Sequence, residues 1–165
     1  MIPPEIIDAV SALKKMASDV AWHENGLSHE TLIALSVSEI ALEGLFLRIR
    51  IPQTIDAFYT MIQLEWGSGR NTVNLQRIEW KAGHNNPNIG PSELRSDYLA
   101  STHIHKFDDN YLINKGRMRP RNLPLARPIY PDPATLEDFF ASAANAFIIP
   151  ELSSVERPAF QQSLL

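Results

Sequence analysis

The feature that most limits the fold of this chain is an alternation of apolar and polar side chains in three successive segments. These segments are residues 45–51, 58–66 and 72–81. Successive side chains of a β-strand point to opposite faces, so the alternation predicts strands that each have one buried face. Between the second and third segments, residues 67–71 read Gly-Ser-Gly-Arg-Asn, a composition typical of a turn. We therefore expect an antiparallel sheet whose neighbouring strands are joined by hairpins.

Two weaker patterns extend this sheet. Residues 32–38 favour a strand, although Ser28 and Glu30 could equally begin a short helix. Residues 98–107 resume the alternation after residues 83–91, which are rich in glycine, proline and asparagine and should interrupt regular structure. The expected sheet is an antiparallel meander of about four to six strands.

A helix is predicted near each end of the chain. Apolar residues recur at spacings of three and four over residues 3–20, and two prolines suit the first turn there. Near the other end, Asp132 is the expected N-cap and Pro133 the first residue of a helix that extends to residue 149. Its apolar stripe should cover one face of the sheet. The stripe consists of Leu136, Phe139, Phe140, Ala143 and Phe147.

The composition favours an ordinary globular protein. The chain has 165 residues, of which 44% are hydrophobic and 21% charged, and a chain of this length fits one domain. We expect a single α+β domain over residues 1–165, with both helices packed against the sheet. Its expected parts are an N-terminal helix (1–25), the antiparallel sheet (32–107), a basic, proline-rich loop (115–131), a C-terminal helix (133–149) and a peripheral tail (151–165).

The absence of cysteine excludes disulfides and thiolate metal sites, and it suits a reducing compartment. The first residues lack the basic and apolar regions of a secretory signal. The sequence also contains no apolar run near the ~20 residues that span a bilayer. We expect a cytoplasmic protein that is neither secreted nor embedded in a membrane.

The net charge of −4 and the pI near 5.7 argue against broad electrostatic attraction to nucleic acid. One local exception is a basic cluster without acidic residues. It consists of Lys115, Arg117, Arg119, Arg121 and Arg127. The cluster could contact RNA or an acidic partner, or it could be a solvated loop.

Three of the five histidines gather in the second half of the predicted sheet. His103 and His105 are two residues apart on one strand, so both imidazoles point to the same face, and His84 lies in the preceding loop. One interpretation is a divalent metal site formed by the three histidines. A carboxylate could complete it, and the spacing does not select among Glu79, Asp97 and Asp108.

The second interpretation is acid–base catalysis on a phosphodiester without any cofactor, with Arg77 steadying the phosphate. Structural interpretations stand beside both. A histidine on a sheet face is commonly a hydrogen-bonded structural residue, and His84 could cap a turn. Arg77 and Glu79 lie on one face of a predicted strand, two residues apart, and could simply form a cross-strand ion pair. His23 and His29 have no partner motif and receive no role.

The order of these residues carries a resemblance. A strand with Arg77 and Glu79, a His-x-x-Pro loop, a His-x-His strand and a helix with an acidic start follow one another. This order resembles small uncharacterised bacterial and prophage proteins, and it is similar, more distantly, to TumE-like toxins of toxin–antitoxin modules. The resemblance covers roughly residues 58–149. Its pattern falls on Arg77, Glu79, His84, Asn86, Pro87, His103 and His105.

The resemblance implies a toxin-like or phage-defence protein that acts on RNA, with RNA or a cognate antitoxin as partner. The 2′-hydroxyl of RNA is an internal nucleophile that DNA lacks. His84, His103 and His105 are the expected catalytic residues, and Arg77 and Lys106 the expected anion contacts. The alternative is a non-enzymatic protein-binding module, such as an antitoxin, an immunity factor or a prophage-encoded inhibitor of host defence. Whether the chain is an enzyme stays open at this point.

Overall fold

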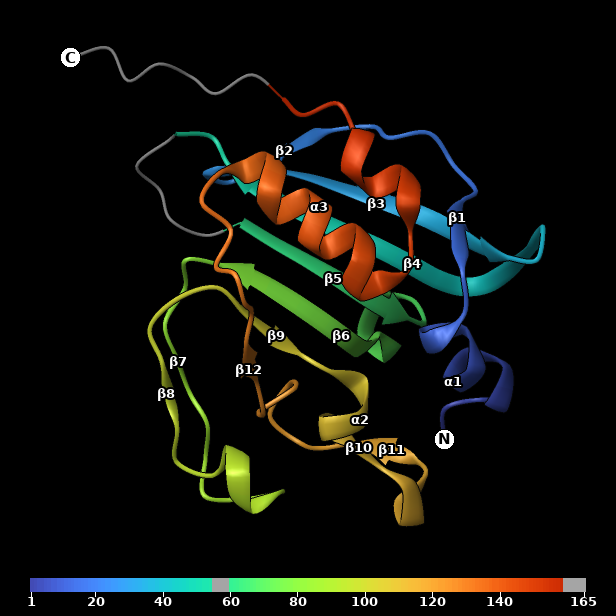
Figure 1. Cartoon of the computed structure of the whole chain (residues 1–165). Helices are drawn as coiled ribbons and strands as arrows, with labels where there is room; N and C mark the ends of the chain where they lie inside the picture. Colours follow the sequence, from blue (N-terminus) through green and yellow to red (C-terminus); the bar gives the residue numbers. More distant parts are fainter. Residues whose placement is uncertain (55–59, 159–165) are drawn as a thin grey trace.

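The computed structural model describes residues 1–54 and 60–158. At its centre lies an antiparallel sheet of eight strands in the order β1-β3-β4-β5-β6-β9-β12, with β2 also paired to β3 (Figure 1). The strands are β1 (Lys14–Met16), β2 (His23–Asn25), β3 (Ser28–Val37), β4 (Ile40–Pro52), β5 (Thr60–Trp66), β6 (Val73–Trp80), β9 (His103–His105) and β12 (Arg127–Pro128). The predicted α+β class is confirmed, and the sheet has more strands than the expected four to six.

The meander from β3 to β6 forms where the alternating patterns predicted it. On β4, Leu47, Ile49 and Ile51 are fully buried, while the residues between them are only partly buried. The doubtful segment at residues 32–38 belongs to a strand, β3, whose ladder with β4 extends back to Ser28. The predicted strand at 58–66 is observed from Thr60 onward, and its first two residues lie outside the described part of the chain.

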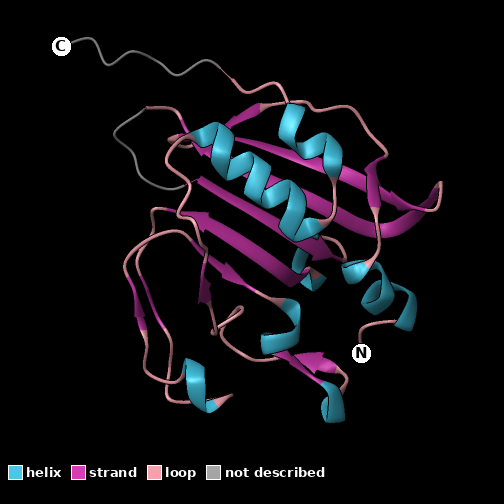
Figure 2. Cartoon of the chain, in the orientation of Figure 1, coloured by secondary structure: helices cyan, strands magenta, loops and turns pink. Residues whose placement is uncertain are grey.

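Helices cover one face of this sheet (Figure 2). They are α1 (Pro4–Ser11), α3 (Leu136–Phe147) and the short 3₁₀ helix η4 (Pro150–Ser154). As the apolar stripe predicted, Phe139, Phe140 and Phe147 are fully buried in the core formed with the strands. The opposite face of the sheet is therefore the one available to polar side chains.

The start of α3 differs from the expected one. Thr135, and not Asp132, is the N-cap: its hydroxyl accepts a hydrogen bond from the amide of Asp138, whose carboxylate accepts one from the amide of Thr135. This reciprocal capping box satisfies two amides at once. Pro133 precedes the helix, and its carbonyl accepts a hydrogen bond from Nε1 of Trp80.

The N-terminal helix is much shorter than the predicted segment 3–20. It ends at Ser11, and the chain then forms β1 at the edge of β3. The cause is Lys14, whose side chain is fully buried and turns back to the end of α1. Its ammonium donates hydrogen bonds of 2.7 to 3.0 Å to three backbone carbonyls at the end of the helix. These are the carbonyls of Ala9, Val10 and Ala12.

Replacing Lys14 with methionine should lower the free energy of unfolding by about 2 kcal/mol, because the buried carbonyls lose their donors. Urea denaturation of the purified chain measures this change. The matched control is Lys15→Met, since Lys15 is exposed and pairs with the exposed Glu39; that variant should unfold like the wild type. Equal stability of both variants would show that Lys14 does not hold the end of α1.

Two segments predicted to be irregular contribute to the core. The expected loop 115–131 contains β11 (Arg117–Met118) and β12, and its residues Leu123, Leu125 and Ala126 are buried. The expected peripheral tail 151–165 begins with η4, which buries Leu152 and is followed by the buried Val155. The apolar side chains of both segments do not follow the period of a helix or of a strand, so the sequence pattern did not predict their burial. Residues 159–165 lie outside the described part of the chain.

The remaining short elements join the strands or pair with one another outside the main sheet. They are η1 (Gly69–Asn71), β7 (His84–Asn85), η2 (Ser92–Leu94), β8 (Tyr98–Leu99), α2 (Phe107–Asn110), β10 (Tyr111–Leu112), η3 (Ile113–Lys115) and β11. β7 pairs with β8, and β10 pairs with β11, each as a two-stranded ribbon. Among the described residues, no helix is both long enough and apolar enough to cross a membrane.

Candidate functional site: a cluster of three histidines and a carboxylate

The three histidines singled out from the sequence lie together in the structure. One ring nitrogen from each of His84, His103 and His105 can be chosen so that all three lie within 4.8 Å of one another. The ring centroids are 5.4 Å apart for His84 and His103, 4.7 Å for His84 and His105, and 5.0 Å for His103 and His105. The expected convergence of the three imidazoles is therefore observed.

The pairing of β6 with β9 places two more predicted residues beside them. In this ladder Arg77 lies opposite His105, and Glu79 lies opposite His103. Alternate residues of a strand share a face, so all four side chains project from the face that α3 does not cover. The pairing of β6 with β9 thus brings together two pairs of residues that are separate in the sequence, Arg77 with Glu79 and His103 with His105.

His84 reaches the cluster from β7, outside the main sheet. Its Nε2 lies 2.9 Å from the carbonyl oxygen of Pro124, which can only accept a hydrogen bond. Two residues further on, the buried side chain of Asn86 accepts from the amide of Ala126 and donates to its carbonyl. The loop that carries His84 is thereby fixed to residues 124–126, as a neighbouring strand would be.

The same segment is held from its other side by residues that sequence reasoning missed. Asn110 is fully buried and bonds both the amide and the carbonyl of Leu125. Asp109 forms a two-point ion pair with Arg127, with distances of 2.7 and 2.8 Å. The side chain of Asn110 bonds the backbone of Leu125 as a neighbouring strand would. No pattern in the sequence marks such an asparagine, so these contacts are seen only in the folded chain.

Glu79 is the carboxylate that the structure selects from the three candidates. Its Oε2 lies 2.9 Å from Nε2 of His103 and 3.7 Å from Nε2 of His105. Its Oε1 lies 2.8 Å from Nε of Arg77 and forms an ion pair with it. The N–H at Nε does not point at this oxygen well enough to form a hydrogen bond. Arg77 and Glu79 therefore form an ion pair with each other along β6, and not the cross-strand ion pair that was the structural alternative.

The hydrogen-bond partners restrict where protons can be. Nδ1 of His103 faces the carbonyl oxygen of Ser101 at 3.0 Å, and its Nε2 faces the carboxylate of Glu79. Both partners are acceptors, so a cation must lie between Nε2 and Oε2: either a proton or a metal ion. The donor bond from His84 to Pro124 leaves Nδ1 of His84 as an acceptor when that ring is neutral.

His105 is the most constrained of the three rings. Its Nε2 lies 3.3 Å from Nη2 of Arg77, which can only donate, while its Nδ1 is buried without a hydrogen-bond partner among the described residues. Burial lowers the pKa of His105 to about 4, an effect that the Arg77 charge reinforces and the Glu79 carboxylate opposes. Burial also lowers the pKa of His84. Both rings are therefore neutral at pH 7.

Four of the five side chains of the cluster are buried. His103 and His105 are 0% exposed, Glu79 is 5% exposed and Arg77 is 9% exposed. His84 is half-buried and is the histidine of the cluster that solvent reaches. A small ligand would therefore meet His84 first.

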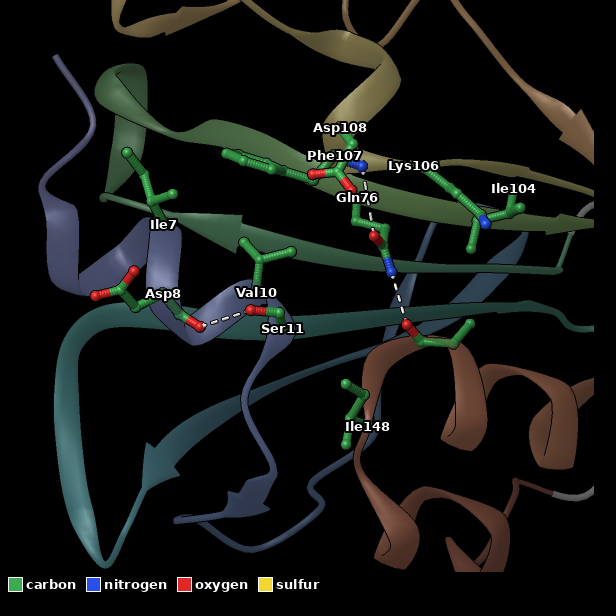
Figure 3. Close-up of a pocket in the computed structure, with 11 residues that line it drawn as sticks. Ile7, Asp8, Val10, Ser11, Gln76, Ile104, Lys106, Phe107, Asp108 and Ile148 are labelled. Atoms are coloured by element: carbon green, nitrogen blue, oxygen red, sulfur yellow. Dashed lines mark hydrogen bonds between the residues drawn. The ribbon is translucent and has the colours of Figure 1, made fainter. Parts of the chain in front are cut away.

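Lys106 does not belong to this cluster, contrary to the expected anion contact. It follows His105 on the chain and therefore points to the other face of the sheet. There it lines a pocket of about 380 Å³ together with Ile104 and Gln76, between α1 and α3 (Figure 3). Gln76 bridges that side by donating to the carbonyl of Ala146 and accepting from the amide of Phe107.

A second charged network lies on the same sheet face, towards β3. The guanidinium of Arg48 bridges Glu30 and Glu65, and Arg50 also donates to Glu30. Gln63 lies between the two networks: its side chain donates to Glu65, and its backbone lies opposite Arg77 in the β5–β6 ladder. Three carboxylates and three guanidinium groups thus lie on one face of the sheet, and their charges balance. They belong to Glu30, Glu65, Glu79, Arg48, Arg50 and Arg77.

Glu30→Gln should be about 2 kcal/mol less stable than the wild type at pH 7, because Glu30 is buried and pairs with two guanidinium groups. Burial raises the pKa of Glu30, but bonds and charges of Arg50 and Arg48 outweigh it and hold that pKa below 4.5. Since the folded pKa is depressed, the stabilisation is present above pH 4.5 and is lost as the pH falls below it.

Denaturation curves at several pH values check this expectation. The stability difference between wild type and Glu30→Gln should narrow as the pH falls below 4.5. A difference that stays constant down to the acid transition would contradict the assigned charge network. Glu39→Gln is the matched control, since Glu39 is exposed and pairs with Lys15.

The other basic and histidine residues lie apart from the cluster. Lys115, Arg117 and Arg121 are exposed, whereas Arg127 pairs with Asp109. His23 and His29 lie on β2 and β3, on the side of the sheet away from β9. The structure thus leaves both of these histidines without a part in the cluster.

Neither a scan against protein-family models nor searches of curated proteins and of solved structures found a match to this chain. The site must therefore be interpreted from its own geometry.

Proposed function

We propose that this chain cleaves RNA and that the reaction takes place at the histidine cluster. The observation that supports this proposal is the gathering of three imidazoles, one carboxylate and one guanidinium, all of them buried except the half-buried His84. Buried titratable groups with shifted pKa values gather at catalytic sites more often than elsewhere. A toxin-like or phage-defence role is the biological setting that we propose for this activity.

The chemistry of RNA cleavage fits the groups present. The 2′-oxygen attacks the adjacent phosphorus and forms a 2′,3′-cyclic phosphate, while the bond from phosphorus to the 5′-oxygen breaks. The 2′-hydroxyl loses a proton, and the departing 5′-oxygen gains one. Positioned side chains commonly assist both proton transfers, and imidazole is the group most often used. The candidates here are the imidazoles of His84, His103 and His105.

Arg77 is the proposed contact for the phosphate. Its guanidinium lies 3.3 Å from His105, so an anion that enters beside His84 and His105 would meet its positive charge. A guanidinium binds phosphate oxygens in a planar, two-point geometry. The exposed Arg121 lies three residues before Pro124, which binds His84, and could contact the RNA chain outside the cluster.

The purified chain should therefore cleave a labelled single-stranded RNA and leave DNA of the same sequence intact. An RNA with a single 2′-deoxy substitution should resist cleavage at that position only. The RNA product should end in a 2′,3′-cyclic phosphate. Equal cleavage of RNA and DNA would overturn the proposed use of the 2′-hydroxyl, and no cleavage of either would favour a protein-binding role.

A further inference from the structure

We infer that the histidine cluster binds one divalent transition-metal ion, with Glu79 as the fourth protein ligand beside His84, His103 and His105. The inference deepens the proposed function, because it names a cofactor for the same site. With an ion bound, the imidazoles would hold it, and the ion in place of the rings would assist the proton transfers. Ion binding is nevertheless measured without RNA, so the two proposals can fail separately.

The spacing of the rings fits such an ion. A zinc–nitrogen bond is about 2.0–2.1 Å and structural zinc sites are tetrahedral, which places three bound imidazole centroids roughly 5 Å from one another. The observed centroid distances are 4.7, 5.0 and 5.4 Å. The rings need only small rotations to bring their nitrogens from within 4.8 Å of one another to a shared ion.

Glu79 occupies the place of a further ligand. Its Oε2 lies 2.9 and 3.7 Å from the Nε2 atoms of His103 and His105, close to the roughly 3.3 Å that separates two ligand atoms around a tetrahedral ion. The same carboxylate binds Arg77 through its other oxygen. One oxygen therefore faces the centre of the cluster, while the second is held outside it.

The outer hydrogen bonds of two of the three rings also match those of a metal centre. A metal-bound histidine usually donates its second ring N–H to a carbonyl or carboxylate, which fixes the ring. Nδ1 of His103 faces the carbonyl of Ser101, and Nε2 of His84 faces that of Pro124. Nε2 of His103 and Nδ1 of His84 are therefore left to bind an ion. The ion would also lie between Nε2 of His103 and Oε2 of Glu79, which face each other.

The charges around the site indicate what an occupied centre would attract. A divalent ion and Arg77 together carry three positive charges against the single negative charge of Glu79. Zinc sites can expand to five ligands. An anionic oxygen, such as that of a phosphodiester or of hydroxide, is the ligand that this imbalance favours.

Cobalt(II) is a suitable probe because its visible spectrum reports tetrahedral coordination. The full-length chain, freed of metals by a chelator, should bind one Co²⁺ per molecule and develop the intense visible bands of a tetrahedral complex. Glu79→Gln keeps the size of the side chain and should weaken binding roughly tenfold or more. His103→Ala should abolish the bands, and His23→Ala should bind as the wild type does.

The result that overturns the inference is a folded wild-type chain, verified by circular dichroism, that shows no bands or binds Co²⁺ no better than His103→Ala. RNA cleavage that persists in excess chelator, together with absent bands, would refute the metal and leave the proposed function intact. Binding of one Co²⁺ per molecule without any RNA cleavage would support the metal site and refute the proposed function.

Discussion

A His103→Ala, His105→Ala double variant should cleave RNA about 10³-fold more slowly than the wild type, because it loses two of the three imidazoles. In cells, expression of the wild-type chain should arrest growth, and the double variant should not. The cleavage rate of the purified proteins and the growth of expressing cultures measure both effects. This is the largest effect on activity that the proposed site implies.

Controls separate this effect from misfolding. Both histidines are fully buried, so the double variant must be shown to be folded by circular dichroism and thermal melting. His84→Asn is a second variant at the half-buried position; it should also lose activity and should disturb the core less. His23→Ala should retain full activity. Full activity in the folded double variant would exclude catalysis by the cluster, and a harmless wild type would favour an antitoxin, immunity factor or inhibitor.

Glu79→Ala should lower the free energy of unfolding by about 3–5 kcal/mol, because it leaves the buried guanidinium of Arg77 without its carboxylate. The same change removes the partner that Nε2 of His103 faces at 2.9 Å. Urea denaturation at pH 7 measures the loss. No other single substitution considered for this chain is expected to destabilise it more.

A double variant distinguishes an ion pair from a purely steric effect. Adding Arg77→Met to Glu79→Ala removes the unpaired charge, so the double variant should be more stable than the sum of the two single losses predicts. The coupling should amount to at least about 1 kcal/mol. Strictly additive losses would mean that Arg77 and Glu79 stabilise the fold independently.

The sheet could be predicted because its period is visible in the sequence. The alternation of Leu45, Leu47, Ile49 and Ile51 is the burial pattern of β4, and the stripe around Phe139 and Phe140 is the buried face of α3. The end of α1 could not be predicted in this way. A lysine whose ammonium caps a helix from three residues beyond its last turn has no periodic signature.

The histidine cluster was predictable in part. The His-x-His spacing places His103 and His105 on one face of β9, and the face of Arg77 and Glu79 follows from the same rule. The position of His84 depends on the paired strands β7 and β8 and on Asn86, which binds the backbone of Ala126. Those contacts join segments 40 residues apart, which a local pattern does not relate.

The choice of Glu79 among three carboxylates likewise required the fold. Asp97 and Asp108 have comparable sequence distances to the histidines, but only the β6–β9 register brings a carboxylate opposite His103. The predicted anion contact of Lys106 does not lie at the histidine cluster. The alternation of side chains along the predicted strand already directs Lys106 to the face opposite His105, where the structure places it.

The central claim is that His84, His103 and His105 act as one centre with Glu79, and histidine nitrogen NMR tests it most directly. Long-range ¹H–¹⁵N spectra resolve the ring nitrogens of all five histidines. As Zn²⁺ is added up to one equivalent, we expect the signals of these three rings to change together and those of His23 and His29 to stay in place. Changes in a single ring, or in none, would contradict the claim.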